Sequence, residues 1–159
     1  MNTKEAVRGQ MDSLPKVVVL MATRNGEHHV AAQLDSILEQ EGVSASIVVG
    51  DDCSIDATVQ VISTLSGTRG VAIRPYDAPS GGAGQNFLRL LRDTDIAGFD
   101  FVAFSDQDDV WHKDKLSRAV GVLNAAGADI YSAAVTAFWS DGTERVLGQS
   151  TTVTDLDFL

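Results

Sequence analysis

The chain has 159 residues, of which 44% are hydrophobic and 21% charged, and its formal net charge at pH 7 is -10. This balance predicts one ordinary soluble globular domain and excludes the basic surface that nucleic-acid binding requires. The single cysteine, Cys53, excludes an internal disulfide and is typical of a cytoplasmic protein. No apolar stretch approaches the roughly 20 residues that cross a bilayer, so no transmembrane segment is expected.

Short apolar runs alternate with segments of helical spacing along the chain. Residues 16–21 are β-branched and continuous, which predicts a strand covered on both faces. The alternation predicts an α/β fold whose mostly parallel sheet has helices on both faces, followed by a C-terminal hairpin at Asp141 and Gly142. The expected elements are strands at 16–21, 47–49, 71–73, 101–104 and 129–139, and helices at 28–39, after Asp56, after the glycine-rich 80–84, and at 113–126. In the third helix, Phe87, Leu88 and Leu91 are expected to face the core.

Three carboxylates, Asp106, Asp108 and Asp109, follow the strand at 101–104 within four residues. No basic residue lies among them, so water or a cation must offset their repulsion. Carboxylate oxygens without nearby His or Cys favour a hard cation, Mg²⁺ or Mn²⁺. The alternative role, capping of the next helix, suits Asp109 but needs only one carboxylate.

Polar residues also follow two other predicted strands. Thr23, Arg24 and Asn25 end the first strand, and Asp51 and Asp52 end the second. The carboxyl ends of parallel strands lie on one edge of the sheet, where open α/β folds bind ligands. A carboxylate there can accept hydrogen bonds from a ribose hydroxyl or a base N–H. Together these groups predict a nucleotide diphosphate held through a metal.

In their order and spacing, these motifs resemble the family 2 glycosyltransferases, which have a nucleotide-sugar-binding GT-A fold, and especially the rhamnosyltransferase-like members. The resemblance covers about residues 15–140. The matching segments are 17–27, 33–38, 51–58, 84–87, 105–111 and 113–116.

The resemblance implies a role for each matching residue. Asp106 to Asp108 matches the family's Asp-X-Asp (DXD) motif, with Asp108 and Asp106 holding the Mn²⁺ or Mg²⁺ that bridges the diphosphate. Such a metal would stabilise charge on the leaving nucleoside diphosphate while an acceptor hydroxyl attacks with inversion. The nucleotide-binding residues implied are Thr23, Arg24, Asn25, Glu27, Asp51, Asp52, Asp106 and Gln107.

The chain departs from the family pattern at three places. Arg24 stands where an aromatic residue is common, and Cys53 stands where Gly is common. The family's catalytic base lies downstream of the fifth strand, so the catalytic residue here is unknown. We therefore expect the donor-binding part of a longer enzyme: a flexible tail at 1–15, a nucleotide-sugar-binding glycosyltransferase domain at 16–147 and a polar tail at 148–159. The carboxylates left as candidate bases are Asp141, Glu144, Asp155 and Asp157.

The implied partners are a dTDP, UDP or GDP sugar as donor and a glycan or glycolipid as acceptor. By analogy with the family, the enzyme is expected to act in the cytoplasm, at the inner face of the membrane. The alternatives are a sugar-nucleotide-binding module without transfer activity, a sugar-phosphate nucleotidyltransferase and a phospho-receiver signalling domain. A nucleotidyltransferase needs a basic, glycine-rich loop after the first strand. A receiver needs its acid pair after the first strand, whereas Asp51 and Asp52 follow the second.

Overall fold

The structure is a computed structural model that describes residues 13–66, 70–139 and 141–148. The expected tails at 1–15 and 148–159, with Asp155 and Asp157, lie almost wholly outside the described residues. The chain divides into two compact units, residues 1–120 and 121–159, and the boundary falls inside helix α4. No helix among the described residues is long and apolar enough to cross a membrane.

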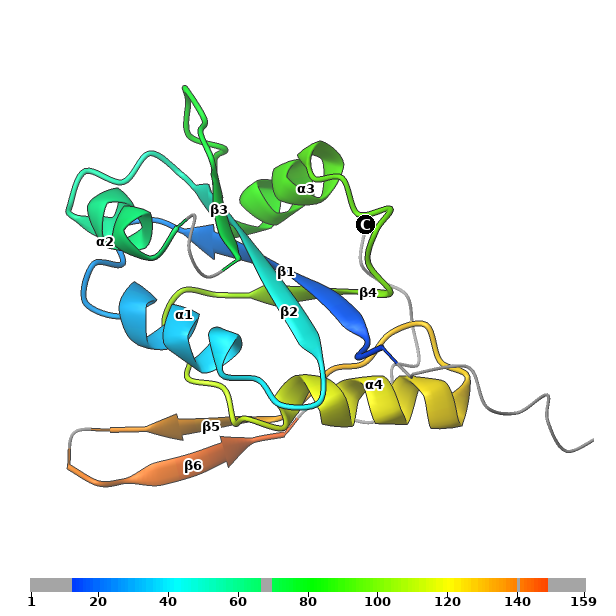
Figure 1. Cartoon of the computed structure of the whole chain (residues 1–159). Coiled ribbons are helices and arrows are strands. Elements are labelled where there is room, and N and C mark those ends of the chain that lie inside the picture. Colours follow the sequence, from blue (N-terminus) through cyan, green and yellow to red (C-terminus); the bar gives the residue numbers. More distant parts are fainter. Residues whose placement is uncertain (1–12, 67–69, 140, 149–159) are drawn as a thin grey trace, which may run out of the picture. The chain divides into compact units, whose positions relative to one another are not determined.

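A four-stranded parallel sheet forms the centre of the first unit, in the order β3-β2-β1-β4 (Figure 1). Its first strand, β1, is one of the two central strands and pairs with both β2 and β4. The strands are β1 Lys16–Thr23, β2 Ser44–Asp51, β3 Val71–Arg74 and β4 Phe101–Ser105; the helices are α1 Val30–Leu38, α2 Thr58–Leu65, α3 Ala83–Asp93 and α4 Lys115–Ala126.

Helices cover both faces of this sheet, as the continuous apolar run of β1 predicts. Alternate residues of a strand point to opposite faces. Val17, Val19 and Met21 pack into the larger core cluster, with side chains of α1, α2 and the start of α4. On the other face, Val18 and Leu20 pack against Leu90 of α3. Figure 1 shows α1 and α2 on one side of the sheet and α3 on the other. The predicted α/β fold is confirmed.

The inward face of α3 was predicted wrongly at two of its three residues. The buried residues of α3 are Asn86 and Leu90, whereas Leu88 is 69% exposed and Leu91 is 37% exposed. Phe87 is half-buried and packs edge-on against Phe104 of β4. The reason lies in β2, where Gly50 has no side chain and Leu90 occupies the space: a Cβ on Gly50 would lie 2.7 Å from Leu90 Cγ. Asn86 donates to the Gly50 carbonyl over 2.7 Å. The helix therefore turns its Asn86–Leu90 face to the sheet.

The second unit contains the hairpin expected at Asp141 and Gly142. Strands β5 Val135–Phe138 and β6 Glu144–Leu147 pair antiparallel as a separate two-stranded sheet. The prediction that residues 129–139 add a fifth strand to the parallel sheet was wrong, since β5 begins at 135 and pairs with β6. A short turn closes the hairpin, with Gly142 at φ +85°, and local closure has a small entropic cost.

Candidate nucleotide-binding site

The carboxyl ends of β1, β2 and β4 meet at one edge of the sheet, as predicted. Thr23 lies beside Asp51 in the β1–β2 register, and Met21 lies beside Ser105 in the β1–β4 register. The Asp52 N–H donates to the Thr23 carbonyl over 2.8 Å, which continues the pairing past the end of β2. The loops that follow these strands therefore share one rim.

Two of these loops are joined by reciprocal hydrogen bonds. The backbone N–H groups of Asn25, Gly26 and Glu27 donate to side-chain oxygens of the β2–α2 loop and the start of α2, at 2.8, 2.7 and 3.2 Å. In return, the Asn25 amide oxygen accepts the Ile55 N–H at 2.9 Å, and the Glu27 carboxylate accepts the Ala57 N–H at 2.8 Å. Asn25 and Glu27 therefore fix the shape of the rim with their own side chains.

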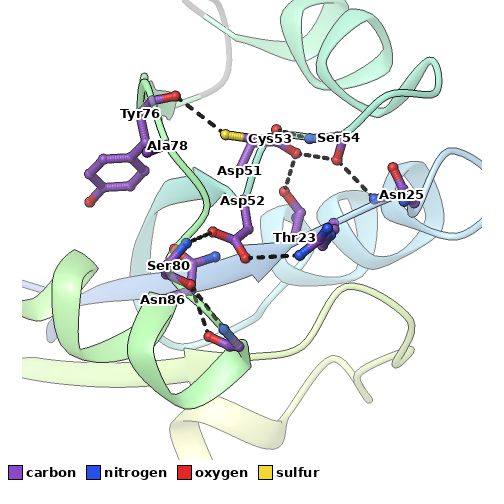
Figure 2. Close-up of polar contacts among 12 residues, drawn as sticks. Thr23, Asn25, Asp51, Asp52, Cys53, Ser54, Tyr76, Ala78, Ser80 and Asn86 are labelled. Carbon is purple, nitrogen blue, oxygen red and sulfur yellow. Dashed lines mark hydrogen bonds and ion pairs between the residues drawn. The ribbon is translucent and has the colours of Figure 1, made fainter.

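Asp51 is a buried carboxylate whose oxygens are occupied by the protein. Its Oδ1 accepts the hydroxyls of Thr23, at 3.0 Å, and Ser54, at 2.6 Å, while its Oδ2 accepts the Ser54 N–H at 2.8 Å (Figure 2). The predicted site residues Thr23 and Asp51 are thus in direct contact. Their observed contacts organise the turn that presents Asp52.

Asp52 is 3% exposed and lies at the centre of a charged network. Its Oδ1 accepts the Ser80 N–H (Figure 2) and one guanidinium N–H of Arg89, the latter at 3.1 Å. Its Oδ2 lies 3.6 Å from Arg24 Nη1. Burial alone would raise the pKa of Asp52. The hydrogen bonds from Ser80 and the charges of Arg89 and Arg24 outweigh burial and hold the pKa below the ordinary value of 3.8. Asp52 is therefore ionised at neutral pH.

Two of the three departures from the family pattern, Cys53 and Arg24, lie at this rim. Cys53 has φ +60°, the left-handed region that favours glycine, which explains why Gly is common at this position in the resembling family. The side chain of Arg24 is 56% exposed. Its guanidinium therefore faces both Asp52 and solvent, where an incoming ligand can reach it.

A pair of hydrogen bonds connects the Arg24 loop to the acid cluster. The Gln107 side chain accepts the Arg24 N–H at 2.8 Å and donates to the Arg24 carbonyl at 3.0 Å. Gly26 makes room for this contact, because a Cβ there would overlap the Gln107 carboxamide. Gln107, the middle residue of the DXD segment, thus fixes that segment against the end of β1.

The flanking carboxylates behave differently from Asp51 and Asp52. Among the described residues, none donates a hydrogen bond to the side chain of Asp106, Asp108 or Asp109, so the helix cap considered for Asp109 is not formed. Partial burial, and then the nearby charges of Asp109 and Asp108, raise the pKa of Asp106 above 3.8. A cation binding there would offset this repulsion, and carboxylate oxygens suit Mn²⁺ and Mg²⁺. The residues present therefore fit a divalent metal.

The protein alone does not supply a complete metal cage. Within the described part of the chain, no group of three or more His, Cys, Asp or Glu residues is placed to hold an ion. Mg²⁺ commonly binds through one or two carboxylates, with water and substrate phosphates as the other ligands. Two carboxylates such as Asp106 and Asp108 would suit an open site of that kind.

The sequence interpretation missed the partners of Asp52 that lie after β3. Arg89, in α3, stacks on the Tyr76 ring, with Cζ 3.4 Å from the ring centroid, and donates to the Asn86 amide oxygen at 3.0 Å. Arg89 and Asn86 are one helical turn apart, which is the available sequence signal. Their meeting with Asp52 depends on how α3 packs on the sheet, which spacing alone does not predict.

A polar rim at the carboxyl edge of a parallel sheet is where open α/β folds bind ligands, and sequence comparison gives the family. The model of Glycosyl transferase family 2 matches residues 18–156, so the chain belongs to that family. The dTDP-rhamnosyl transferase RfbG of Shigella flexneri is 39% identical over 140 residues, which are 87% of this chain and 48% of RfbG. The chain thus spans about half the length of that relative.

Solved structures of glycosyltransferases share the fold. Staphylococcus aureus TarS residues 1–349, in complex with UDP-GlcNAc, is 28% identical with a TM-score of 0.61, covering 69% of this chain and 31% of that one. Glucosyl-3-phosphoglycerate synthase from Mycobacterium tuberculosis, in complex with Mn²⁺, UDP and glucosyl-3-phosphoglycerate, is 26% identical with a TM-score of 0.50, covering 69% and 39%. The GT-A fold and the family resemblance predicted from the sequence are confirmed.

Proposed function

We propose that residues 16–147 form the donor-binding part of a metal-assisted glycosyltransferase that takes a sugar from a nucleotide diphosphate. The observation that carries this proposal is the junction at Gln107. Its two hydrogen bonds with Arg24 hold two kinds of group on one rim. One is an ionised aspartate, Asp52, and the other is the acid pair Asp106 and Asp108, whose side chains accept no hydrogen bond from the described residues. A nucleoside diphosphate needs both kinds of group, one for the base and one for the phosphates.

In this proposal the base binds beside Asp52. Its Oδ1 is already occupied by Ser80 and Arg89, so Oδ2 accepts the base N–H. Arg24 moves from Oδ2 and stacks its guanidinium plane on the base, in place of the aromatic residue common in the family. Thr23, Asn25, Glu27 and Asp51 hold the walls of this pocket through the loop contacts described above.

The phosphates bind on the Asp106–Asp108 side. Asp106 accepts a ribose hydroxyl and shares the cation with Asp108, while Gln107 fixes the backbone between them. The cation, Mn²⁺ or Mg²⁺, stabilises negative charge on the diphosphate when bound. The Mn²⁺ and UDP in the mycobacterial synthase structure support a divalent cation in this role.

The similarity to RfbG favours a dTDP sugar, dTDP-rhamnose first, as the donor to test, ahead of UDP and GDP sugars. The acceptor in this proposal is a glycan or glycolipid hydroxyl, which attacks the donor sugar with inversion. The reaction in this proposal takes place in the cytoplasm, at the inner membrane face. No residue is assigned as the catalytic base. A sugar-nucleotide-binding module without transfer activity uses the same donor site, so donor binding and sugar transfer are measured separately.

Calorimetry with dTDP, UDP and GDP, each with and without Mn²⁺, tests the donor site. We expect saturable binding of at least one nucleotide, strengthened by Mn²⁺, and tighter binding of dTDP than of the other two. Nucleotide affinity that does not change when Mn²⁺ is added would contradict the proposal, as would the absence of binding by all three nucleotides. Release of nucleotide from dTDP-rhamnose in the presence of a glycan acceptor then separates a transferase from a binding module.

A further inference from the structure

Three polar side chains on or just past α1 lie at helical spacing and turn inward: Gln33, Ser36 and Gln40. Gln33 is 0% exposed and Gln40 is 9% exposed, although they neighbour the apolar core residues Leu34 and Ile37. A buried amide is costly unless its hydrogen bonds are satisfied. The partners of these side chains therefore reveal why polar groups occupy this face.

Ser36 and Gln40 bind the C-terminal end of the acid loop, which is defined here as residues 106–114 between β4 and α4. Ser36 Oγ accepts the Trp111 N–H at 3.1 Å. The Gln40 amide donates to the His112 carbonyl at 2.7 Å and accepts the Leu116 N–H at 2.8 Å. The Glu41 N–H adds a bond to the Lys113 carbonyl at 2.8 Å.

Gln33 binds the N-terminal end of the same loop. Its amide lies 2.6 Å from Ser105 Oγ, at the last residue of β4. With the amide oxygen turned toward Trp111, it also accepts the indole N–H at 3.2 Å, and its nitrogen donates to the Asp109 carbonyl. The orientation of such an amide is assigned from its partners, and this one satisfies both of its ends.

We infer that Gln33, Ser36 and Gln40 are positioning residues that set the backbone of the acid loop and thereby the placement of Asp106 and Asp108. The expected effect on metal binding rests on the proposed donor site, whereas the positioning of the acid loop does not. The two carboxylates accept no hydrogen bond from the described residues, so their placement follows the backbone of the loop. Gln107 holds that backbone against the end of β1, and the α1 side chains hold it from the other side. Supporting groups behind metal ligands commonly change metal affinity by about 10- to 100-fold when removed.

The test uses Gln40→Met, which keeps side-chain length but removes the hydrogen bonds to the His112 carbonyl and the Leu116 N–H, together with the one to the Ser36 carbonyl. Ser36→Ala is a milder change. Ile37→Val is the matched control, since it alters the buried face of the same helix but removes no hydrogen bond to the acid loop. Two readouts are needed: the gain in nucleotide affinity on adding Mn²⁺, and NMR backbone order parameters of Asp106 to Asp109 without ligand. Circular dichroism first establishes that each variant is folded.

We expect Gln40→Met to reduce the Mn²⁺-dependent gain about tenfold with metal-free binding unchanged, and the order parameters to fall from about 0.85 to below about 0.6. Ser36→Ala should show a smaller loss, Ser36→Thr should restore it, and Ile37→Val should change neither readout. Unchanged order parameters in Gln40→Met would overturn the inference. Absence of any Mn²⁺ effect in the wild type would instead overturn the donor-site proposal, and the order parameters would still decide this inference.

Discussion

Replacing Asp52 tests whether the charged network at the rim stabilises the fold. In Asp52→Ala, the Ser80 N–H and Arg89 Nη2 lose their acceptor, and a guanidinium whose side chain is 14% exposed loses its counter-charge. Removing one partner of a buried ion pair costs about 3–5 kcal/mol. Arg89 keeps its bonds to the Ala78 carbonyl and the Asn86 amide, so the low end, about 3 kcal/mol, is expected. Asp52→Asn retains an acceptor but loses the charge, and about 1–2 kcal/mol is expected.

Urea unfolding followed by circular dichroism measures these losses. Asp114→Asn is the control, because it removes one negative charge from an exposed pair with Arg118 and should cost no more than about 0.5 kcal/mol. A double-mutant cycle with Arg89→Met isolates the pair. The reasoning is refuted if Asp52→Ala and Asp114→Asn unfold at the same urea concentration, or if Asp52 and Arg89 show no coupling.

The pH dependence of the same variants has a defined sign. The pKa of Asp52 is lowered in the folded state, so its stabilising contribution is present above 3.8 and is lost as pH falls through the lower folded pKa. The difference in unfolding free energy between wild type and Asp52→Asn should therefore be constant from about pH 7 to pH 5 and narrow below about pH 4. A difference that widens on acidification would contradict this assignment.

Three further predictions concern the glycines and the acid loop. Gly50→Ala should destabilise the protein by about 1–3 kcal/mol, because its Cβ overlaps the fully buried Leu90, and thermal unfolding should return toward the wild-type midpoint in Gly50→Ala/Leu90→Val. Gly26→Ala displaces only the flexible end of Gln107, so unfolding should change by less than about 1 kcal/mol while Mn²⁺-dependent nucleotide affinity falls; equal effects on metal-free and metal-supported binding would count against it. Because the pKa of Asp106 is raised and a metal needs the ionised carboxylate, Mn²⁺ affinity should rise with pH through that raised pKa, and Asp106→Asn should flatten the titration curve.

Much of the sheet could be predicted because its signals are local. The β-branched run at 16–21 marked β1, and the polar residues after β1, β2 and β4 marked the rim. The hairpin turn was equally clear, but its first strand was assigned to the wrong sheet. Strand spacing does not reveal whether β5 pairs with β4 or with its immediate neighbour along the chain.

The contacts between loops could not be predicted, because they depend on packing. Leu88 and Leu91 were expected on the core-facing side of α3 because they are hydrophobic. Leu90 lies there instead, because Gly50 has no side chain and leaves space for it. Arg89 is next to Leu90 in α3, and in this packing its guanidinium lies within hydrogen-bond distance of Asp52. The proposed roles of the rim residues stay predictions until ligand binding is measured.

The most direct test of the central claim is the Mn²⁺-dependent affinity of dTDP for the wild type and for Asp108→Asn, measured by calorimetry at one ionic strength. Asp114→Asn is the control for the loss of one negative charge. We predict that Mn²⁺ strengthens dTDP binding in the wild type and in Asp114→Asn. In Asp108→Asn, the increase in dTDP affinity on adding Mn²⁺ should be smaller by a factor of about ten or more. An undiminished Mn²⁺ effect in Asp108→Asn would contradict the assignment of the metal-binding carboxylate and, with it, the proposed donor site.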